Sequence, residues 1–314
     1  MEFKKQGSEF EEVATKVRKI ANTEVTTQIT KINQDVVTSI EKFSDYGLST
    51  LGNTVNFPAK FVKDVFDTNT ELATQIVKDR VKLYFDKKKP DFYAREFEGK
   101  ICGVVSDKYA YFDDYQVIDI LENSPLANLT FRNNLISPER FHTRAIDYDE
   151  PFIIGTDTSP LFFAYFIDNS MVGQSSFKVQ LGIYRLACTN GMILPVRDFV
   201  ICRQIHRGNK DISKEFNQSI EFLVKKKNDI KELITNMSLE KATIETLQEE
   251  FRRDYISKKL GTNQKETQKI FDLYEGTYDG QTKWGMANAI TEFARDLQDI
   301  NRREFIEKAA FKAA

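Results

Sequence analysis

Hydrophobic residues along the chain are spaced as in helices at both ends and as in strands in between. From Glu9 to Phe43 apolar residues recur mostly three and four positions apart, without proline or glycine, which predicts one long amphipathic helix. Gly47, Gly52 and Pro58 then break the chain. A second helix is expected from about Ala59 to Phe85. The first helix has only a narrow apolar stripe, so we expect it to pack on the body of the protein or on a second copy.

After Pro90 the pattern changes to short segments that are typical of strands. Alternation begins in the run from Lys100 to Phe112, and a short helix is expected near Tyr115 to Leu121. Extended segments bounded by turn residues follow. They are Phe131–Ile136, Phe141–Ile146, Phe152–Gly155, Leu161–Asp168, Ser176–Arg185 and Phe199–His206. The segments predict a mainly antiparallel sheet of about six strands.

Helical spacing returns at Ile212 and continues to the end of the chain. The expected helices are Ile212–Leu223, Leu239–Leu260, Thr267–Tyr274 and a last one that begins near Thr282 and continues past Ile300. This order of elements predicts an α+β fold, with a mainly antiparallel central sheet covered by C-terminal helices and an N-terminal helical extension. We expect residues 1–90 to be a helical region for packing or self-assembly, and residues 91–314 to be the α+β core domain.

Composition limits the class of protein. The 314 residues include 45 Lys and Arg against 47 Asp and Glu, a net charge of −2, which excludes a histone-like basic protein. No run approaches the ~18 uncharged apolar residues of a membrane helix, and the first residues do not resemble a secretory signal. Three cysteines without C-x-x-C spacing argue against a disulfide framework or a zinc ribbon. We therefore expect a protein of the reducing cytosol.

Positive charge is concentrated in residues 174–210, which hold six basic residues and one acid, Asp198. A local charge of +5 in a chain of −2 is the segregation that a polyanion-binding surface requires. The candidate nucleic-acid-binding residues are Lys178, Arg185, Arg197, Arg203, His206, Arg207 and Lys210. The alternative is that the arginines pair with acids of the predicted C-terminal helices, such as Glu245 and Glu249.

Candidate catalytic groups are few. Cys188 with His206 has the composition of a thiol nucleophile and its base, but an apolar strand-like run around Cys188 would keep the thiol inert. Asp107, Asp113 and Asp114 form an acidic cluster that could hold a divalent cation, although acids beside a turn more often form the turn. Nucleotide-binding and zinc-protease motifs do not occur in the sequence. A non-enzymatic function without catalytic residues, metal or cofactor is favoured.

Two further motifs carry structural expectations. Asn190 and Gly191 favour a tight turn, because both residues tolerate positive φ. In the last predicted helix, Trp284 stands beside small residues, so we expect it to pack against the sheet. Asn288 and Glu292 are four positions apart on one face of that helix, from which they could cap a neighbouring loop or reach a ligand.

Several motifs occur together in a fixed order: Gly103–Tyr109, Asn169–Gly173, Arg185–Met192, Arg203–Arg207 and Thr282–Glu292. Jointly they resemble a family of phage-, prophage- and plasmid-borne proteins with a shared domain of unknown function, over about residues 99–295. The motif residues are Ser106, Asp107, Tyr109, Arg185, Cys188, Asn190, Gly191, Trp284, Gly285, Asn288 and Glu292. Family members often have His-Asp-Gly where this chain has Ser170 to Gly173, so no role for that histidine is carried over.

The resemblance implies a mobile-element protein that acts in the cytosol of a bacterial host. By analogy with single-strand annealing proteins, our first hypothesis is a non-enzymatic protein that binds or anneals single-stranded DNA in replication or recombination. The N-terminal helices would then assemble it into a homo-oligomer. The first alternative is a phage accessory or structural protein that binds a host or virion protein. The second is a hydrolase that uses Cys188 and His206 or the acids near Asp113.

Overall fold

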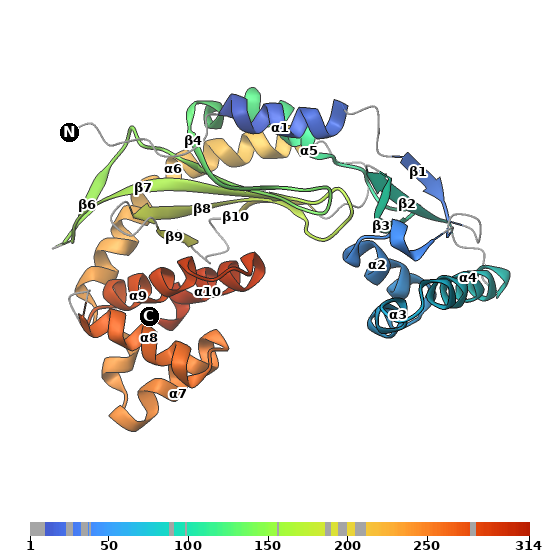
Figure 1. The fold of residues 1–314 in the computed structure, drawn as a ribbon. Helices are drawn as coiled ribbons and strands as arrows, with labels where there is room; N and C mark the ends of the chain where they lie inside the picture. The colour runs from blue at the N-terminus through green and yellow to red at the C-terminus, as the bar shows by residue number, and fades with distance from the viewer. Residues whose placement is uncertain are drawn as a thin grey trace.

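The molecule is an α+β protein with a large and a small lobe (Figure 1). The computed structural model describes residues 10–22, 28–32, 37, 39–87, 91–97, 99–155, 157–185, 190–193, 200–204, 212–276 and 281–314. The expected fold class, an antiparallel sheet with C-terminal helices and an N-terminal helical region, is confirmed.

The helices are α1 (Phe10–Asn22), α2 (Asp45–Val55), α3 (Ala59–Phe66), α4 (Thr70–Lys87), α5 (Asp114–Glu122), α6 (Ile212–Leu239), α7 (Glu249–Leu260), α8 (Gln264–Gly276), α9 (Lys283–Arg295) and α10 (Ile300–Ala313). The strands are β1 (Gln28–Lys31), β2 (Phe92–Phe97), β3 (Lys100–Ser106), β4 (Thr130–Ile136), β5 (Phe141–Ile146), β6 (Phe152–Ile154), β7 (Asp157–Asn169), β8 (Phe177–Arg185), β9 (Asn190–Ile193) and β10 (Val200–Gln204).

The large lobe is built on a seven-stranded antiparallel sheet. Its strand order is β10-β8-β7-β5-β4, while β6 pairs with β7 and β9 pairs with β8. Each of the six extended segments expected between Phe131 and His206 overlaps one of these strands, although β7 extends beyond the expected Leu161–Asp168 at both ends. The strand β9 is additional. Asn190 and Gly191 pair with Arg185 and Tyr184 inside it, so the expectation of a tight turn at Asn190–Gly191 is wrong.

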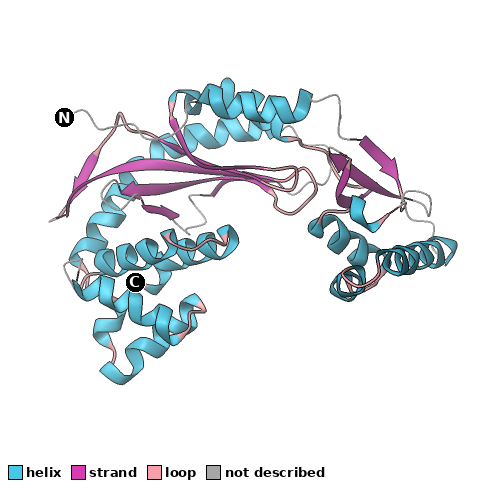
Figure 2. Cartoon of the chain, viewed as in Figure 1, coloured by secondary structure: helices cyan, strands magenta, loops and turns pink. Residues whose placement is uncertain are grey.

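Side chains of the large sheet alternate between two faces, both of which helices cover (Figure 2). Phe141, Phe163 and Phe177 lie on the face toward α1, α5 and α6 and belong to the main hydrophobic core. Residues one position along from these point to the opposite face, where α9 and α10 lie below the sheet. This second face carries the charged groups described below.

The small lobe has its own sheet, β1-β2-β3, and its own core between that sheet and α2, α3 and α4. Leu51 of α2, Val77 of α4 and Val104 of β3 are buried in this core. The lobes meet where the turn between β7 and β8 reaches β3. A Cβ atom at Gly103 would lie 2.5 Å from that of Val172, so only glycine permits this contact. The predicted division at residue 90 stays a prediction, and hydrophobic contacts between α2–α4 and β2–β3 cross it.

The long helix expected from Glu9 to Phe43 is wrong. The chain forms α1, then the strand β1, then a short 3-10 helix at Ile40–Lys42. The reason is the run Thr23-Glu-Val-Thr-Thr-Gln-Ile-Thr, because β-branched residues lose side-chain freedom in a helix and favour strands. The helix α1 packs on β4 and α5 of the large lobe, through Val13 and Val17 among others.

Other helix boundaries also differ from the expectation. The helix expected from Ala59 to Phe85 is divided into α3 and α4, and the Asn69 side chain accepts a hydrogen bond from the Leu72 amide at the start of α4. The helix expected from Thr282 past Ile300 ends at Arg295, and Asp299 caps a new helix, α10, by accepting from two backbone amides. Within the described residues, no helix has both the length and the apolar character that a bilayer span requires.

Candidate functional site

A row of basic residues follows β5 on the face of the sheet that α10 covers. His142 and Arg144 alternate along the strand with Phe141, Thr143 and Ala145, which lie on the opposite face. Arg140 immediately precedes the strand. All three basic side chains are buried, so each requires partners that compensate its charge.

Those partners come from α10 and β7. Arg144 donates from Nη2 to both carboxylate oxygens of Glu307, at 2.9 and 2.7 Å. Arg140 donates from Nη2 to Asp168 at 3.0 Å and also to Glu304. Because Glu304 and Glu307 are three positions apart, they lie on one side of α10. The ion pairs therefore attach α10 to the second face of the sheet.

His142 lies between two carboxylates. Its Nδ1 is 2.9 Å from Asp168 Oδ1 and 3.1 Å from Glu304 Oε1. Burial alone would lower the pKa of His142, but the charges and hydrogen bonds of both acids outweigh it and raise the pKa above the usual value. Burial would raise the pKa of Glu304, but the hydrogen bond to His142 and nearby positive charges lower it to about 2. Against the same effect of burial, His142, Lys178 and Arg140 hold the pKa of Asp168 well below its usual range.

The donor atoms of His142, Asp168 and Glu304 lie within 4.8 Å of one another, which is the spacing of a metal centre. Two cations already occupy that environment: Arg140 contacts both carboxylates, and the Lys178 ammonium is 3.0 Å from Asp168. A divalent ion would have to displace these cations or add two charges beside them. We therefore assign the group to an ion-pair network rather than to a metal centre.

A cavity of about 500 Å³ opens beside this network, between β8, α10 and the turn after β7. We call it the α10 cavity. Every described residue that lines it is polar. They are Arg140, Gln174, Ser175, Ser176, Lys178, Gln180, Asn301, Glu304 and Lys308. Three of these residues are cations and one is a carboxylate, so the walls carry an excess of positive charge.

Some polar atoms at the α10 cavity are buried without partners. In the described part of the chain, Nε of Arg140, Oε1 of Gln180 and Oγ of Ser175 have no hydrogen-bond partner. Arg140 and Gln180 are each less than one-tenth exposed. Because a buried polar group without a hydrogen bond costs free energy, such atoms indicate a place where a ligand could bind.

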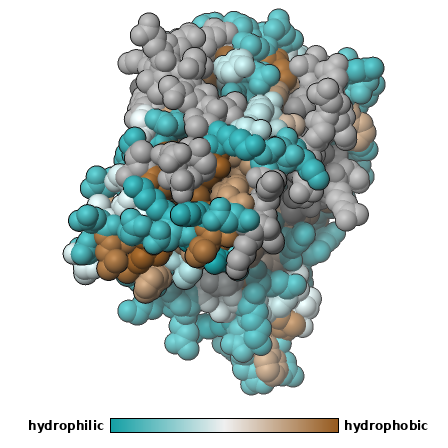
Figure 3. Space-filling model, turned by 90° about the vertical axis from the view of Figure 1, so that its right-hand side faces the viewer, coloured by the Kyte–Doolittle hydropathy of each residue, from teal (hydrophilic) through white to brown (hydrophobic). Residues whose placement is uncertain are grey.

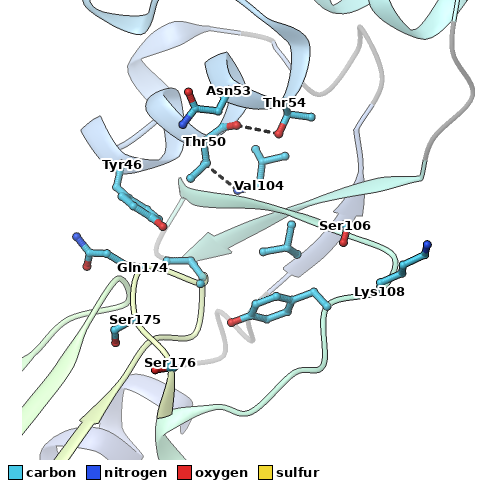
Figure 4. A pocket seen from close by; sticks show the side chains of 14 residues that line it. Tyr46, Thr50, Asn53, Thr54, Val104, Ser106, Lys108, Gln174, Ser175 and Ser176 are labelled. Atoms are coloured by element: carbon cyan, nitrogen blue, oxygen red, sulfur yellow. Dashed lines mark hydrogen bonds between the residues drawn. The ribbon is translucent and has the colours of Figure 1, made fainter. Parts of the chain in front are cut away.

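A second cavity, of about 570 Å³, lies where the two lobes meet, and we call it the junction cavity (Figure 4). Gln174, Ser175 and Ser176 line both cavities, so the two adjoin along this turn. Figure 4 shows Tyr46 of α2 and Gln174 on one side of the junction cavity and Lys108 on the other. Its walls combine hydroxyl and amide groups with the rings of tyrosines and the side chains of valines.

The acidic cluster is used in structural contacts. Asp113 caps α5 in a capping box with Gln116 and accepts two hydrogen bonds from buried Arg95, at 2.9 and 3.1 Å. Asp114 is buried and accepts a hydrogen bond from the Asn169 amide at 2.8 Å. Burial raises the pKa of Asp114 to about 7, partly offset by that hydrogen bond. Asp107 is exposed on the turn after β3. These positions agree with the alternative that acids here form turns and caps.

The predicted nucleic-acid-binding residues are only partly described. Lys178 lines the α10 cavity and pairs with Asp168. Arg185 ends β8 and is half-buried. Arg203 lies in β10, opposite Lys178 in the strand register. Arg197, His206, Arg207 and Lys210 lie outside the described residues, as does Cys188. The nucleic-acid role of these residues stays a prediction.

Six of the motif residues lie at the junction cavity or in α9. Ser106 and Tyr109 line the junction cavity, and the Tyr109 hydroxyl donates to the Ser170 carbonyl at 3.0 Å. Trp284 is buried in the main core, as expected for a packing residue. Asn288 is also buried and donates to the Trp284 carbonyl of its own helix at 2.8 Å. At the start of the same helix, α9, Gly285 donates to the Thr282 hydroxyl, and Glu292 lies half-buried further along.

Sequence reasoning missed Arg140, His142, Arg144, Glu304 and Glu307. A signal was present, because basic residues at every second position of a strand otherwise rich in apolar residues mark a polar face. Their partners could not be identified, since Arg144 and Glu307 are 163 positions apart.

Comparison with known proteins places most of the chain in a single family. A family model described as "Domain of unknown function (DUF932)" matches residues 101–309. This agrees with the expectation of a family that shares a domain of unknown function over about residues 99–295. No curated protein and no solved structure matches the chain.

Proposed function

The chain belongs to the DUF932 family, and we propose that it is a non-enzymatic protein that binds single-stranded DNA through residues 174–210 and the α10 cavity. On this proposal it is encoded by a phage or plasmid and acts in DNA replication or recombination in the cytosol of a bacterial host. Binding to phosphates requires cations that are clustered, and it does not require a basic protein as a whole. This chain has a net charge of −2 but a local charge of +5 in residues 174–210.

The observation that carries the proposal is that the start of the basic stretch lines the α10 cavity. Its first residues, Gln174 to Gln180, include the turn and the strand that form one wall of the α10 cavity. In that cavity Lys178 is joined by Arg140 and Lys308, which come from distant parts of the chain. Cations contributed by three segments therefore converge on one polar depression.

Strand pairing supports the same conclusion. In the register of β10 and β8, Arg203 lies directly opposite Lys178, and Val200 lies opposite Gln180. Two of the predicted phosphate-binding residues are thus neighbours in the fold although they are 25 positions apart in the sequence.

The proposal is tested by the salt dependence of oligonucleotide binding. We expect a fluorescent oligo-dT to bind, with the logarithm of the binding constant falling by about 0.7 per phosphate contact for each unit of log salt. Arg203→Gln and Arg207→Gln should each reduce that slope by about one contact. Lys225→Gln is the matched control, because Lys225 is an exposed lysine of α6 outside the basic stretch. Binding that is indifferent to salt, or equal losses in all three variants, would contradict the proposal.

A second candidate, self-assembly, is favoured by apolar residues on the small lobe. Leu72 and Leu83 of α4 are eleven positions apart, which places them on one face of the helix, and both are about half exposed. Phe61 of α3 is 55% exposed. Figure 3, which views the molecule from the side of the small lobe, shows hydrophobic surface surrounded by hydrophilic surface. Such a patch is typical of an interface.

We propose that Phe61, Leu72 and Leu83, which we call the α3–α4 patch, bind a second copy of the chain, as expected for a homo-oligomer assembled through the N-terminal region. Sedimentation of the wild-type protein should show an oligomer, and Leu72→Glu with Leu83→Glu should give the monomer. Leu239→Glu is the control, because Leu239 is 76% exposed at the end of α6, far from the patch in the sequence. A wild-type monomer at all concentrations would contradict self-assembly and leave the patch to a host or virion protein.

A further inference from the structure

We propose that the α10 cavity binds a phosphate group of a nucleotide, and that the attached nucleoside occupies the adjoining junction cavity. This inference rests on the proposed function, because it identifies where one nucleotide of the bound strand would be held. Both cavities, of about 500 and 570 Å³, are of a size that holds small ligands.

The α10 cavity offers hydrogen-bond donors that its own acids do not use up. An ammonium has three donors, and Lys178 is 3.0 Å from Asp168 while Lys308 is 2.9 Å from Glu304. The Arg140 guanidinium uses Nη2 for the acids and Nη1 for Asn301, which leaves Nε without a partner in the described residues. A phosphate has several acceptor oxygens and matches such a set.

Electrostatics favours an anion over a metal ion in the same space. When His142 is protonated, the network beside the cavity holds two carboxylates, Asp168 and Glu304, against four cations. These cations are Arg140, His142, Lys178 and Lys308. Arg140 is 6% exposed, so water screens its charge less than it would at the surface. A phosphate would compensate the excess of positive charge, whereas a divalent cation would increase it.

Gln180 and Ser175 supply the neutral part of the phosphate site. Gln180 is 7% exposed and its Oε1 has no partner within the described structure. A flip of the side-chain amide, which exchanges the positions of Oε1 and Nε2, would present its NH₂ group to an anion. The Ser175 hydroxyl, also buried without a partner among the described groups, can rotate to donate in the same way.

The junction cavity has the chemistry of a nucleoside site. The rings of Tyr46 and Tyr109 line it, and the Tyr109 hydroxyl is anchored to the Ser170 carbonyl, which fixes the position of the ring. Aromatic rings provide stacking surfaces for any base. The amides of Asn53 and Gln174 can both donate to and accept from base edges. Since the turn Gln174–Ser176 lines both cavities, a single ligand can extend from one into the other.

Calorimetric titration of the full chain at low ionic strength, in a buffer without phosphate, tests the inference. The probes are inorganic phosphate, thymidine 5′-monophosphate and an oligo-dT. We expect all three to bind, and the nucleotide to bind more tightly than phosphate. Lys308→Gln should weaken binding of phosphate and nucleotide about tenfold, because it removes one charged hydrogen bond. Gln180→Leu should weaken both, and Asn53→Ala should weaken only the nucleotide.

Lys312→Gln is the matched control. Lys312 is one turn beyond Lys308 on α10, is exposed and does not line the cavity. Equal weakening by the two lysine variants would show a general effect of surface charge and overturn the site. Because Lys308 is partly exposed, its variant is expected to fold even if Gln180→Leu does not, and circular dichroism checks each variant.

The titrations separate this inference from the proposed function. If the oligonucleotide binds with a strong salt dependence, but Lys308→Gln and Gln180→Leu bind every probe as the wild type does, the phosphate site is wrong and DNA binding stands. If nucleotide and phosphate bind at the α10 cavity but the oligonucleotide does not, the site stands and the DNA-binding function is wrong. Failure of all three probes to bind overturns both.

Discussion

Charged side chains are buried in the second face of the large sheet, and their environment determines what each one contributes. Arg144 and Glu307 form a two-fold hydrogen-bonded pair with 1% and 0% of their side chains exposed. Arg302 of α10 and Glu266 of α8 form a pair whose side chains are 40% and 19% exposed. Taking charges out of water is costly, so removing one partner of the buried pair leaves a charge that nothing compensates. Breaking the buried pair should therefore cost more stability than breaking the partly exposed pair.

The first prediction follows from this difference. Glu307→Gln should lower the free energy of unfolding by about 3–5 kcal/mol, because the Arg144 guanidinium stays buried without its counter-charge. Glu266→Gln, which breaks the partly exposed pair between α8 and α10, should cost no more than about 1 kcal/mol. Urea denaturation of the two variants measures both values. Equal losses would show that the buried pair contributes no more than a surface pair.

A second prediction concerns pH and Asp114. Burial raises the pKa of this carboxyl from 3.8 to about 7 in the folded state. Because the pKa is higher in the folded state, the carboxyl loses its proton at a lower pH in the unfolded chain than in the folded protein. The stabilising contribution of the neutral acid is therefore complete below about pH 4 and is lost as pH rises to about 7.

Asp114→Asn keeps the oxygen that accepts from Asn169 and removes the titration. Its free energy of unfolding should match that of the wild type near pH 4 and exceed it at pH 8. Thermal unfolding at the two pH values measures the difference. Asp119→Asn, which changes an exposed carboxyl of the same helix α5, is the matched control. A gain for Asp114→Asn that is the same at both pH values would exclude titration as its cause.

At the scale of elements, close contacts decide where helices are allowed. Gly47 was expected to break the chain, yet it lies inside α2 and is buried. A Cβ atom there would lie 2.0 Å from the Ile101 carbonyl oxygen of β3. The glycine is required by the approach of a helix to a strand, and the sequence alone does not distinguish that requirement from a turn.

This geometry gives a third prediction. Gly47→Ala should destabilise the protein by about 2 kcal/mol or more, although alanine is the better helix former, because α2 must move away from β3. Gly276→Ala in α8, where nothing lies within 4 Å of the added atom, should be neutral or stabilising by up to about 1 kcal/mol. Differential scanning calorimetry measures both. Stabilisation by Gly47→Ala would show that α2 and β3 are not in close contact.

The strands were predicted better than the helix boundaries, for a physical reason. Phe141–Ile146 and Phe177–Arg185 alternate because one face of the sheet packs on the apolar core while the other carries polar groups, and the sequence shows this alternation directly. The end of α9 and the start of α10 depend on the Asp299 side chain, which caps two amides at a position where the apolar spacing continues. A local cap thus overrode a periodic pattern.

The candidate site was predicted only in outline. Lys178 was identified from charge alone, but the residues that converge on it were not, because Lys308 and Arg140 reach it only when α10 covers the sheet. Charge in a sequence is a property of neighbours along the chain, whereas charge in a cavity is a property of neighbours in space. The Oε1 of Gln180, which has no hydrogen-bond partner within the described residues, has no signature in the sequence.

At the scale of the whole molecule, a small apolar cluster joins the lobes. Phe97 and Cys102 of the small lobe pack against Met171 and Val172 of the turn after β7. Cys102 is 5% exposed, and burial, with a contribution from the negative charge of Glu139, raises the pKa of its thiol to about 11. Its reactivity therefore reports separation of the lobes.

The fourth prediction uses this thiol. Alkylation of Cys102, followed by peptide mass spectrometry, should be slow in the wild type and at least several-fold faster in Val172→Ala, because a smaller side chain loosens the contact between the lobes. Val62→Ala, which shortens a buried valine of α3 away from the junction, is the control for general loss of stability. Equal acceleration by the two variants would show that alkylation requires unfolding of the whole small lobe.

The position of α10 has a consequence for assembly of the fold. An apolar helix can shift along an apolar sheet at little cost in free energy, since one hydrophobic contact replaces another. Glu304 and Glu307 must each meet a different arginine, and a slip of one turn, about 5.4 Å, would leave both arginines facing the wrong residues. The two ion pairs therefore specify the register of the last helix on the sheet, because a shifted helix would leave buried charges without partners.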